Sequence, residues 1–159
     1  MTTSFEEFVT AQVTPLLRYA TVLTGDPHLA QDVVQECLLR AQQRWGRIGG
    51  LDAPAAYLKR MVTNEFLSWR RRLKPHVPLS DVDPGTHDPT DLYDVRDAML
   101  QAIAKLPRKQ RAAVVLRYYE GYDDREIAVT LGCSQTTVRS HISRALSTLR
   151  TVDRVKEAL

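Results

Sequence analysis

Six polar side chains in the last third of the chain have the spacing of a helix face that contacts DNA. They are Thr136, Thr137, Arg139, Ser140, Ser143 and Arg144. Most of them recur at intervals of three or four residues, which places them on one side of a helix. Arginine can donate two hydrogen bonds to guanine, and hydroxyl groups can bind bases or phosphates. These residues therefore predict a helix whose outward face contacts nucleic acid.

The residues around this face predict a helix-turn-helix. The inward positions of its two helices are Ile127, Ala128, Leu131, Val138, Ile142, Ala145, Leu146 and Leu149. Asp123 or Asp124 can cap the first helix, Gly132 permits a positive φ in the turn, and Ser134 can cap the second helix. This order is typical of DNA-binding proteins. The alternative is a plain helical hairpin, which makes no demand on its outward residues.

Composition limits the classes to which the chain can belong. It has 159 residues, 43% hydrophobic and 26% charged, which is ordinary for a globular protein of one or two small domains. No apolar run approaches the roughly 18 residues of a membrane span, and the N-terminus lacks a signal-peptide pattern. Cys37 and Cys133 lie too far apart in sequence to suggest a disulfide framework. We therefore expect a cytoplasmic protein with reduced thiols and no direct membrane insertion.

Apolar periodicity predicts an all-α fold. We expect a first helix kinked or broken near Pro15, ended by Gly25, and a second helix capped by Asp26. The second helix should extend to about residue 45, followed by a loop over 47–52 and a third helix over about 54–73. A fourth helix begins near residue 92, and a fifth runs from about 107 to 121 with Tyr119 on its inward face.

The segment 74–91 separates two small helical domains, 1–73 and 92–159. It contains four prolines and one glycine and has almost no apolar periodicity, so we expect a flexible linker. Residues 75–97 have a net charge of −5, whereas 47–74 and 98–159 each have +5. Two basic blocks around an acidic one suggest two modules that bind a polyanion, although solvated helix faces would give the same charges.

The second helix has two kinds of surface. A wide apolar stripe consists of Val33, Val34, Cys37, Leu38, Ala41 and Trp45. Asp32, Gln35 and Glu36 cluster on a polar side. A helix with both surfaces can bind a partner, and on pattern alone a fully buried central helix is an equal alternative.

With these segments in this order, the chain resembles bacterial RNA polymerase sigma factors of the extracytoplasmic-function group (group 4), in particular its actinobacterial SigE-like branch. AQDVVQECLLRAQQRW resembles region 2.2 of that family, and PAAYLKRMVTNEFLSWRRR resembles regions 2.3 to 2.4. The segment from LPRKQ to ALSTLR, residues 106–150, resembles region 4. The resemblance implies a promoter-specificity subunit whose partners are core RNA polymerase and promoter DNA. Many members also bind an anti-sigma factor.

The resemblance also implies residue roles in the first domain. Asp32, Val33, Gln35 and Glu36 match the motif that docks on the β′ clamp helices. The residues that match the −10 contacts are Ile48, Lys59, Arg60, Asn64, Arg70 and Arg71. The loop 47–52 would capture a flipped base, with Ile48 where an aromatic residue is often found. Lys59 and Arg60 would contact phosphates and Asn64 would line the melted strand. Trp69 beside the arginine run suits stacking on DNA, although core packing of Trp69 and a solvated helix end are the alternatives.

In the second domain, Arg139, Ser140, Ser143 and Arg144 match the residues that read the −35 element. The resemblance implies that this domain also contacts the β flap, and that the acidic linker passes through the polymerase toward the RNA exit channel.

Enzyme and metal functions have no support in the sequence. There is no P-loop, HExxH or CxxC, and the histidines do not combine with cysteines at metal-ligand spacing. We therefore expect no catalytic residue, cofactor, metal or small-molecule substrate. The rival interpretation is an autonomous dimeric regulator with a sensor domain. A nucleic-acid enzyme is a weaker rival because it would need a catalytic cluster.

Overall fold

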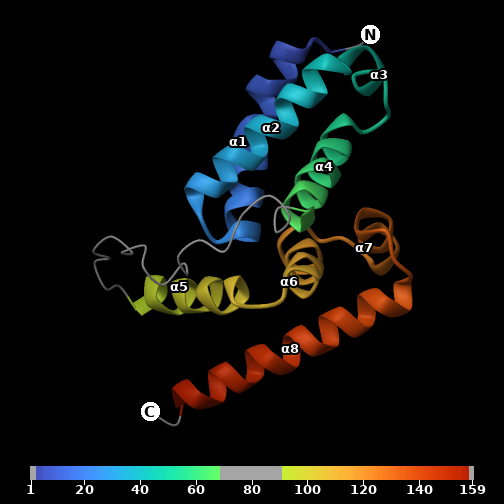
Figure 1. Ribbon diagram of the computed structural model, residues 1–159. Helices are drawn as coiled ribbons and strands as arrows, with labels where there is room; N and C mark the ends of the chain where they lie inside the picture. Colours follow the sequence, from blue (N-terminus) through green and yellow to red (C-terminus); the bar gives the residue numbers. More distant parts are fainter. Residues whose placement is uncertain (1–2, 69–90, 158–159) are drawn as a thin grey trace.

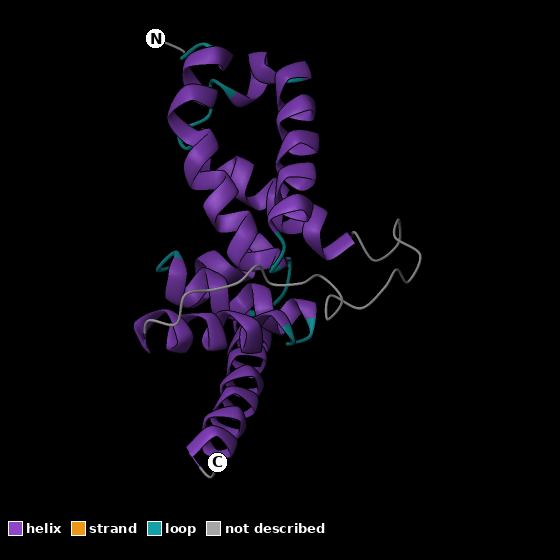
Figure 2. Cartoon of the chain, turned by 90° about the vertical axis from the view of Figure 1, so that its left-hand side faces the viewer, coloured by secondary structure: helices purple, strands orange, loops and turns teal. Residues whose placement is uncertain are grey.

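The structure, a computed structural model, describes residues 3–68 and 91–157, with side chains described over 3–68 and 98–151. Throughout these ranges the regular structure is helical, which confirms the predicted all-α class. The helices are α1 (Phe5–Thr24), α2 (Pro27–Gln43), α3 (Trp45–Ile48), α4 (Pro54–Ser68), α5 (Asp91–Ala104), α6 (Arg108–Val114), the π-helix η3 (Val115–Tyr119), α7 (Asp124–Leu131) and α8 (Gln135–Glu157). We call α1–α4 the N-terminal bundle and α5–α8 the C-terminal bundle; Figures 1 and 2 show them stacked end to end.

Local capping signals determine where the first two helices meet. The Ser4 hydroxyl accepts a hydrogen bond from the Glu7 amide at 3.2 Å, and α1 ends at Gly25 with φ +72°. Asp26 then caps α2 by accepting from the His28 amide at 2.9 Å. The predicted stop and start are confirmed.

Of the kink or break predicted near Pro15, the break is absent, because α1 runs through that residue as one helix. Proline removes the hydrogen bond to the carbonyl of Ala11. Both Pro15 and Ala11 lie on the exposed side of α1. Water can therefore satisfy that carbonyl, and the helix continues.

The predicted loop over 47–52 is partly helical. After α2 ends at Gln43, the single turn α3 covers 45–48. Trp45 packs against Phe5 and Phe8, with ring centroids 5.5 and 4.8 Å away, and its indole donates to the Thr3 carbonyl at 2.9 Å. These contacts fix the turn against the start of α1. Helix α4 begins at Pro54 as predicted, and its predicted continuation to residue 73 lies outside the described residues.

The predicted fifth helix contains an irregular turn. Helix α6 passes into the π-helix η3, whose hydrogen bonds skip one more residue than those of an α-helix. This wider turn rotates the following side chains away from the α-helical face. Tyr119, predicted to face inward, is therefore 46% exposed.

One hydrophobic core extends through both bundles. It includes Tyr19 and Val33 in the N-terminal bundle and Leu116, Ile127 and Val138 in the C-terminal bundle, each at most 2% exposed. Two small domains packed in this way bury more surface together than either buries alone. The linker expected between them, 74–91, lies almost wholly outside the described residues.

Candidate nucleic-acid interface

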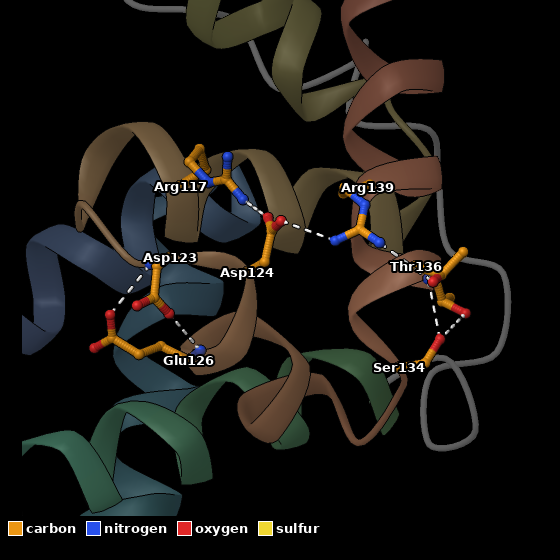
Figure 3. A network of polar contacts seen from close by, with 8 residues as sticks. Arg117, Asp123, Asp124, Glu126, Ser134, Thr136 and Arg139 are labelled. Atoms are coloured by element: carbon orange, nitrogen blue, oxygen red, sulfur yellow. Dashed lines mark hydrogen bonds and ion pairs between the residues drawn. The ribbon is translucent and has the colours of Figure 1, made fainter.

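Three local devices fix the helix-turn-helix geometry: two helix caps, which Figure 3 shows, and a glycine in the turn. Asp123 caps α7 by accepting from the Glu126 amide at 2.8 Å, and Glu126 accepts from the Asp123 amide at 3.2 Å in return. Gly132 takes φ +68° at the end of α7, a conformation that glycine adopts without steric cost. Ser134 then caps α8 by accepting from the Thr137 amide at 3.1 Å. The capping and turn residues predicted from the sequence are thus confirmed, with Asp123 as the first cap.

Helix α8 presents the predicted polar row to solvent. The exposed members of the row are Thr136, Arg139, Ser140, Ser143 and Arg144. Thr137 is half-buried, and its hydroxyl lies 2.9 Å from that of Ser134. On the opposite face, Val138, Ile142, Ala145 and Leu149 are buried, and Leu146 is half-buried. The amphipathic division predicted for this helix is therefore present.

Asp124 joins the start of α7 to the outward face of α8. Its carboxylate pairs with Arg117 of η3 and, at 3.3 Å, with Arg139 (Figure 3). Arg139 also donates to the Thr136 hydroxyl at 3.3 Å, while its side chain remains 59% exposed. The carboxylate thus orients the guanidinium without removing it from solvent.

A groove of about 300 Å³ lies beside this ion pair. Its lining residues are Arg117, Asp124, Arg139, Ile142, Ser143, Leu146 and Arg150. Three arginines and a single aspartate give this wall a positive balance that favours a phosphate backbone. The pKa of nearby His141 is lowered by partial burial and by the charges of Lys109 and Arg144.

On α2, the residues predicted to bind the polymerase divide between surface and core. Asp32 and Gln35 are exposed, and Leu39, which the sequence analysis did not select, is 60% exposed on the same side of the helix. Glu36 is half-buried and pairs with Arg40 at 2.8 Å. Val33 lies in the core, so the expected direct contact of its side chain is corrected to a packing role that supports its exposed neighbours.

Arg40 connects this α2 surface to α4. Its guanidinium also reaches Glu65 at 2.9 Å, and Glu65 is only 4% exposed. Cys37 lies nearby and is 1% exposed; burial, with the charge of Glu65, raises the pKa of its thiol to about 12. The position of Glu36 is therefore coupled to a buried carboxylate of the neighbouring helix.

The predicted −10 residues also differ in accessibility. Arg60 and Asn64 are exposed on α4, whereas Lys59 is half-buried and pairs with Glu120. Ile48, which the resemblance places in the −10 loop, is 2% exposed, so its side chain packs in the core below α3 and is not open to DNA in this structure. Arg70, Arg71 and Trp69 lie outside the described residues.

Comparison with known proteins identifies the family. Residues 8–75 match the model for sigma-70 region 2, and residues 96–149 match the model for sigma-70, region 4. The RNA polymerase sigma-E factor of Streptomyces avermitilis is 38% identical over 148 residues, which cover 92% of this chain and 83% of the relative. The ECF RNA polymerase sigma factor SigL of Mycobacterium tuberculosis is 36% identical over 142 residues, 85% and 80% of the two chains. The chain belongs to the extracytoplasmic-function sigma factors.

The fold of this sigma factor also has a solved counterpart. The sigma factor RpoE of Bartonella quintana, in its complex with the anti-sigma factor NepR, superposes with a TM-score of 0.69 at 24% identity. The match covers 95% of this chain and 97% of the other. The N-terminal bundle corresponds to region 2 and the C-terminal bundle to region 4. The chain is therefore a non-catalytic subunit that directs RNA polymerase to promoters.

Sequence reasoning missed several residues of the sigma-factor surface. Asp124 was considered only as a cap, and Arg117 comes from η3, whose placement beside α8 no local pattern reveals. Arg150 could have been found, because it follows Arg139 and Ser143 on α8 at helical spacing. Leu39 could have been found, because it follows Asp32 and Gln35 at helical spacing. Within the described ranges, none of the helices is long and apolar enough to cross a bilayer.

Proposed function

We propose that the two bundles divide promoter recognition between them. In this proposal the domain 92–159 binds the −35 element and the β flap. The domain 1–73 binds the β′ clamp helices and the −10 element, and the linker 74–91 connects them. The chain acts in the cytoplasm, where core polymerase and DNA meet. The observation that supports the proposal most strongly is the exposed polar row of α8, held by a capped turn of helix-turn-helix geometry.

At the −35 element, Arg139 is the proposed base reader. Its guanidinium is exposed yet oriented by Asp124, so it can exchange water for a guanine edge at little entropic cost. Ser140, Ser143 and Arg144 would supply neighbouring contacts to bases and phosphates. Thr136 and Thr137 at the start of α8 would position the helix on the backbone, since helix N-termini favour phosphate.

At the −10 element, α4 is the proposed DNA-binding helix. Lys59 and Arg60 would neutralise phosphates, and Asn64 would face the melted strand. Arg70 and Arg71, which follow α4 in the sequence, would continue this basic stripe. Ile48 would hold α3 in place by packing in the hydrophobic core, and its side chain would not contact the flipped base.

For the polymerase, the proposed docking surface is the exposed side of α2. Asp32 and Gln35 supply polar contacts, Leu39 adds an exposed apolar one, and Arg40 positions Glu36. An apolar residue surrounded by polar groups is a common arrangement at protein interfaces. An anti-sigma factor is a further proposed partner, which co-purification from the native host would test.

The experiment that tests this assignment is transcription by core polymerase with Arg139→Ala. A base reader should lose activity mainly on promoters that keep the preferred −35 sequence, by about 5–150-fold for a contact worth about 1–3 kcal/mol. Arg18→Ala removes an exposed arginine of α1 and is the matched control. Equal loss on every template would make Arg139 a phosphate contact and would overturn its assignment as a base reader.

The same assay separates the sigma factor from an autonomous regulator. A regulator that binds as a dimer should protect a palindrome from nuclease digestion without polymerase. The sigma proposal requires that protection of a promoter appear only with core polymerase.

A further inference from the structure

Contacts between the two bundles use the same side of α4 that we assign to DNA. Phe66 of α4 is buried beneath two arginines of α6. The guanidinium carbons of Arg108 and Arg111 lie 5.4 and 5.3 Å from the centre of its ring. Arg108 also donates to the Phe66 carbonyl at 3.0 Å. Region 4 is therefore attached to the C-terminal half of α4 by directional contacts as well as by packing.

Arg111 makes this attachment costly to maintain. It donates to the carbonyls of Leu23 and Leu106 at 3.2 and 3.1 Å, while its Nε is buried without a partner. Burial, together with the charge of Arg108, lowers its pKa to about 10, so the guanidinium still carries its charge at neutral pH. A buried cation bonded to neutral carbonyls regains hydration when the contact opens. The interface therefore combines the apolar contacts of the shared core with polar contacts that water can replace when the bundles separate.

Among the contacts between the bundles, the ion pair between Lys59 and Glu120 most resembles a contact with DNA. Glu120 directly follows the π-helix of region 4, and the two side chains are 23% and 12% exposed. A carboxylate resembles a phosphate as a partner for lysine, because both are anions whose oxygens accept hydrogen bonds. While Glu120 holds it, Lys59 is not available to a DNA strand.

Next to this pair, Arg60 also faces region 4. It lines a groove of about 530 Å³ together with residues of α7 and the turn, among them Arg125, Val129, Cys133 and Ser134. A DNA strand laid along α4 at Lys59 and Arg60 would enter the space of this turn. The proposed −10 contact of Lys59 and its contact with region 4 therefore exclude each other.

The α2 surface remains open in the same arrangement. Asp32, Gln35 and Leu39 are exposed although Lys59 of α4 is held by Glu120. Core polymerase can therefore bind the chain before the bundles separate, whereas DNA contact at α4 requires separation.

From these contacts we propose that the DNA-binding side of α4 is an interaction surface for region 4 of the same chain, with Glu120 occupying the position of a DNA phosphate on Lys59. This inference rests on the proposed assignment of Lys59 and Arg60 to the −10 element. The apparent dissociation constant of the free chain for DNA is then the intrinsic constant divided by the fraction of molecules that are open. A chain that is mostly closed therefore binds DNA more weakly than an open one. In this proposal core polymerase favours open molecules because it binds α2 of one bundle and, through the β flap, region 4 of the other, and only separated bundles make both contacts.

The test uses the full chain and two variants that weaken the contact from region 4. Glu120→Gln removes the carboxylate charge, and Arg108→Ala removes the bond to Phe66. The probe is a labelled single strand of the −10 sequence from a promoter that the wild-type chain serves with core polymerase. Without polymerase, both variants should bind it more tightly than wild type, by about tenfold.

Arg108→Ala makes the test discriminating, because loss of a positive charge alone weakens DNA binding. Tighter binding by this variant therefore requires that a hidden surface has opened. Glu6→Gln, at an exposed glutamate of α1, controls for the loss of a negative charge in the other variant. Circular dichroism establishes whether each variant is folded. If Arg108→Ala does not fold, the comparison of Glu120→Gln with Glu6→Gln still tests the inference.

A distance measurement completes the test. Spin labels at Gln42→Cys in α2 and Ser147→Cys in α8, both exposed positions, report the separation of the bundles in a chain with Cys133→Ser. The distance should lengthen in Glu120→Gln and, for wild type, on addition of core polymerase. Unchanged distances, or binding by Glu120→Gln no tighter than by Glu6→Gln, would overturn the inference while run-off transcription by wild type still supports the sigma assignment. Failure of wild type to initiate at any promoter would instead overturn the proposed function.

Discussion

Replacing Arg40 by methionine should destabilise the chain because it leaves a buried carboxylate without its arginine. Arg40 bridges Glu65 at 2.9 Å and Glu36 at 2.8 Å. Glu65 is 4% exposed, whereas Arg40 and Glu36 are 41% and 42% exposed. The cost therefore arises mainly at Glu65, where water cannot replace the lost partner.

The magnitude follows from this difference in exposure. Removing one partner of a fully buried ion pair costs about 3–5 kcal/mol. Because Arg40 is partly exposed and Glu65 keeps further interactions, we expect about 2 kcal/mol at this contact. The pair with Glu36, four residues away on α2, adds about 0.3–0.5 kcal/mol. At roughly 2–4 °C per kcal/mol for a chain of this size, the midpoint of thermal unfolding should fall by about 5–10 °C.

Thermal unfolding followed by circular dichroism measures this change, with Arg18→Met as the control at an exposed arginine of α1. The control should stay within about 0.5 kcal/mol of wild type. In the background of Arg40→Met, Glu65→Gln should recover at least half of the loss, because a neutral amide is less costly to bury than a carboxylate. The reasoning fails if Arg40→Met costs no more than Arg18→Met, or if Glu65→Gln makes the loss larger.

Three further outcomes test separate parts of the structure. In run-off transcription, Asp124→Asn should reduce discrimination between preferred and altered −35 elements by up to about fivefold, because an ion pair such as that with Arg139 is worth about 0.2–1 kcal/mol. Unchanged discrimination would show that Asp124 does not orient this arginine. The Cys37 thiol, with its pKa raised to about 12, should resist alkylation at mildly alkaline pH until the chain is unfolded, as mass spectrometry would show, and fast native-state labelling would contradict its burial. Gly132→Ala should lower the free energy of unfolding by about 1–2 kcal/mol because φ is +68° there, whereas Gly46→Ala in the helical turn α3 should raise it by about 0.5–1 kcal/mol. Urea unfolding measures both changes, and two changes of the same sign would refute the conformational argument.

The helix boundaries that the sequence predicts correctly have local causes. Gly25 and Gly132 take positive φ, and Asp26 and Ser134 accept hydrogen bonds from amides two or three residues ahead. Such signals act over a few residues, so a sequence pattern contains all the information needed. The polar row of α8 was predictable for the same reason, because helical periodicity determines which side chains share a face.

The errors arise where packing or hydrogen-bond register over a longer range decides the outcome. Tyr119 is exposed because a π-helix interrupts the α-helical register, and no residue type marks such a turn. Val33 and Ile48 belong to sequence motifs that the family resemblance assigns to partners, yet both side chains lie in the core. A motif identifies a surface only when the packing of its helix is known.

The contact between the bundles was beyond sequence reasoning. Glu120 and Lys59 lie 61 positions apart in the chain, and neither belongs to a local pattern that includes the other. Arg111 reads as an ordinary member of a basic run, although its guanidinium is bonded to the carbonyl of Leu23 in the other bundle. Long-range pairs of this kind require the relative placement of the helices.

The most direct test of the central claim is run-off transcription with sigma-free core polymerase. The purified chain is added to core polymerase on a library of genomic fragments, and the 5′ ends of the RNA are sequenced. The account predicts discrete start sites that share two upstream elements at a constant spacing. An absence of starts above core polymerase alone, with the purified chain still able to bind double-stranded DNA by itself, would contradict it and favour the autonomous regulator.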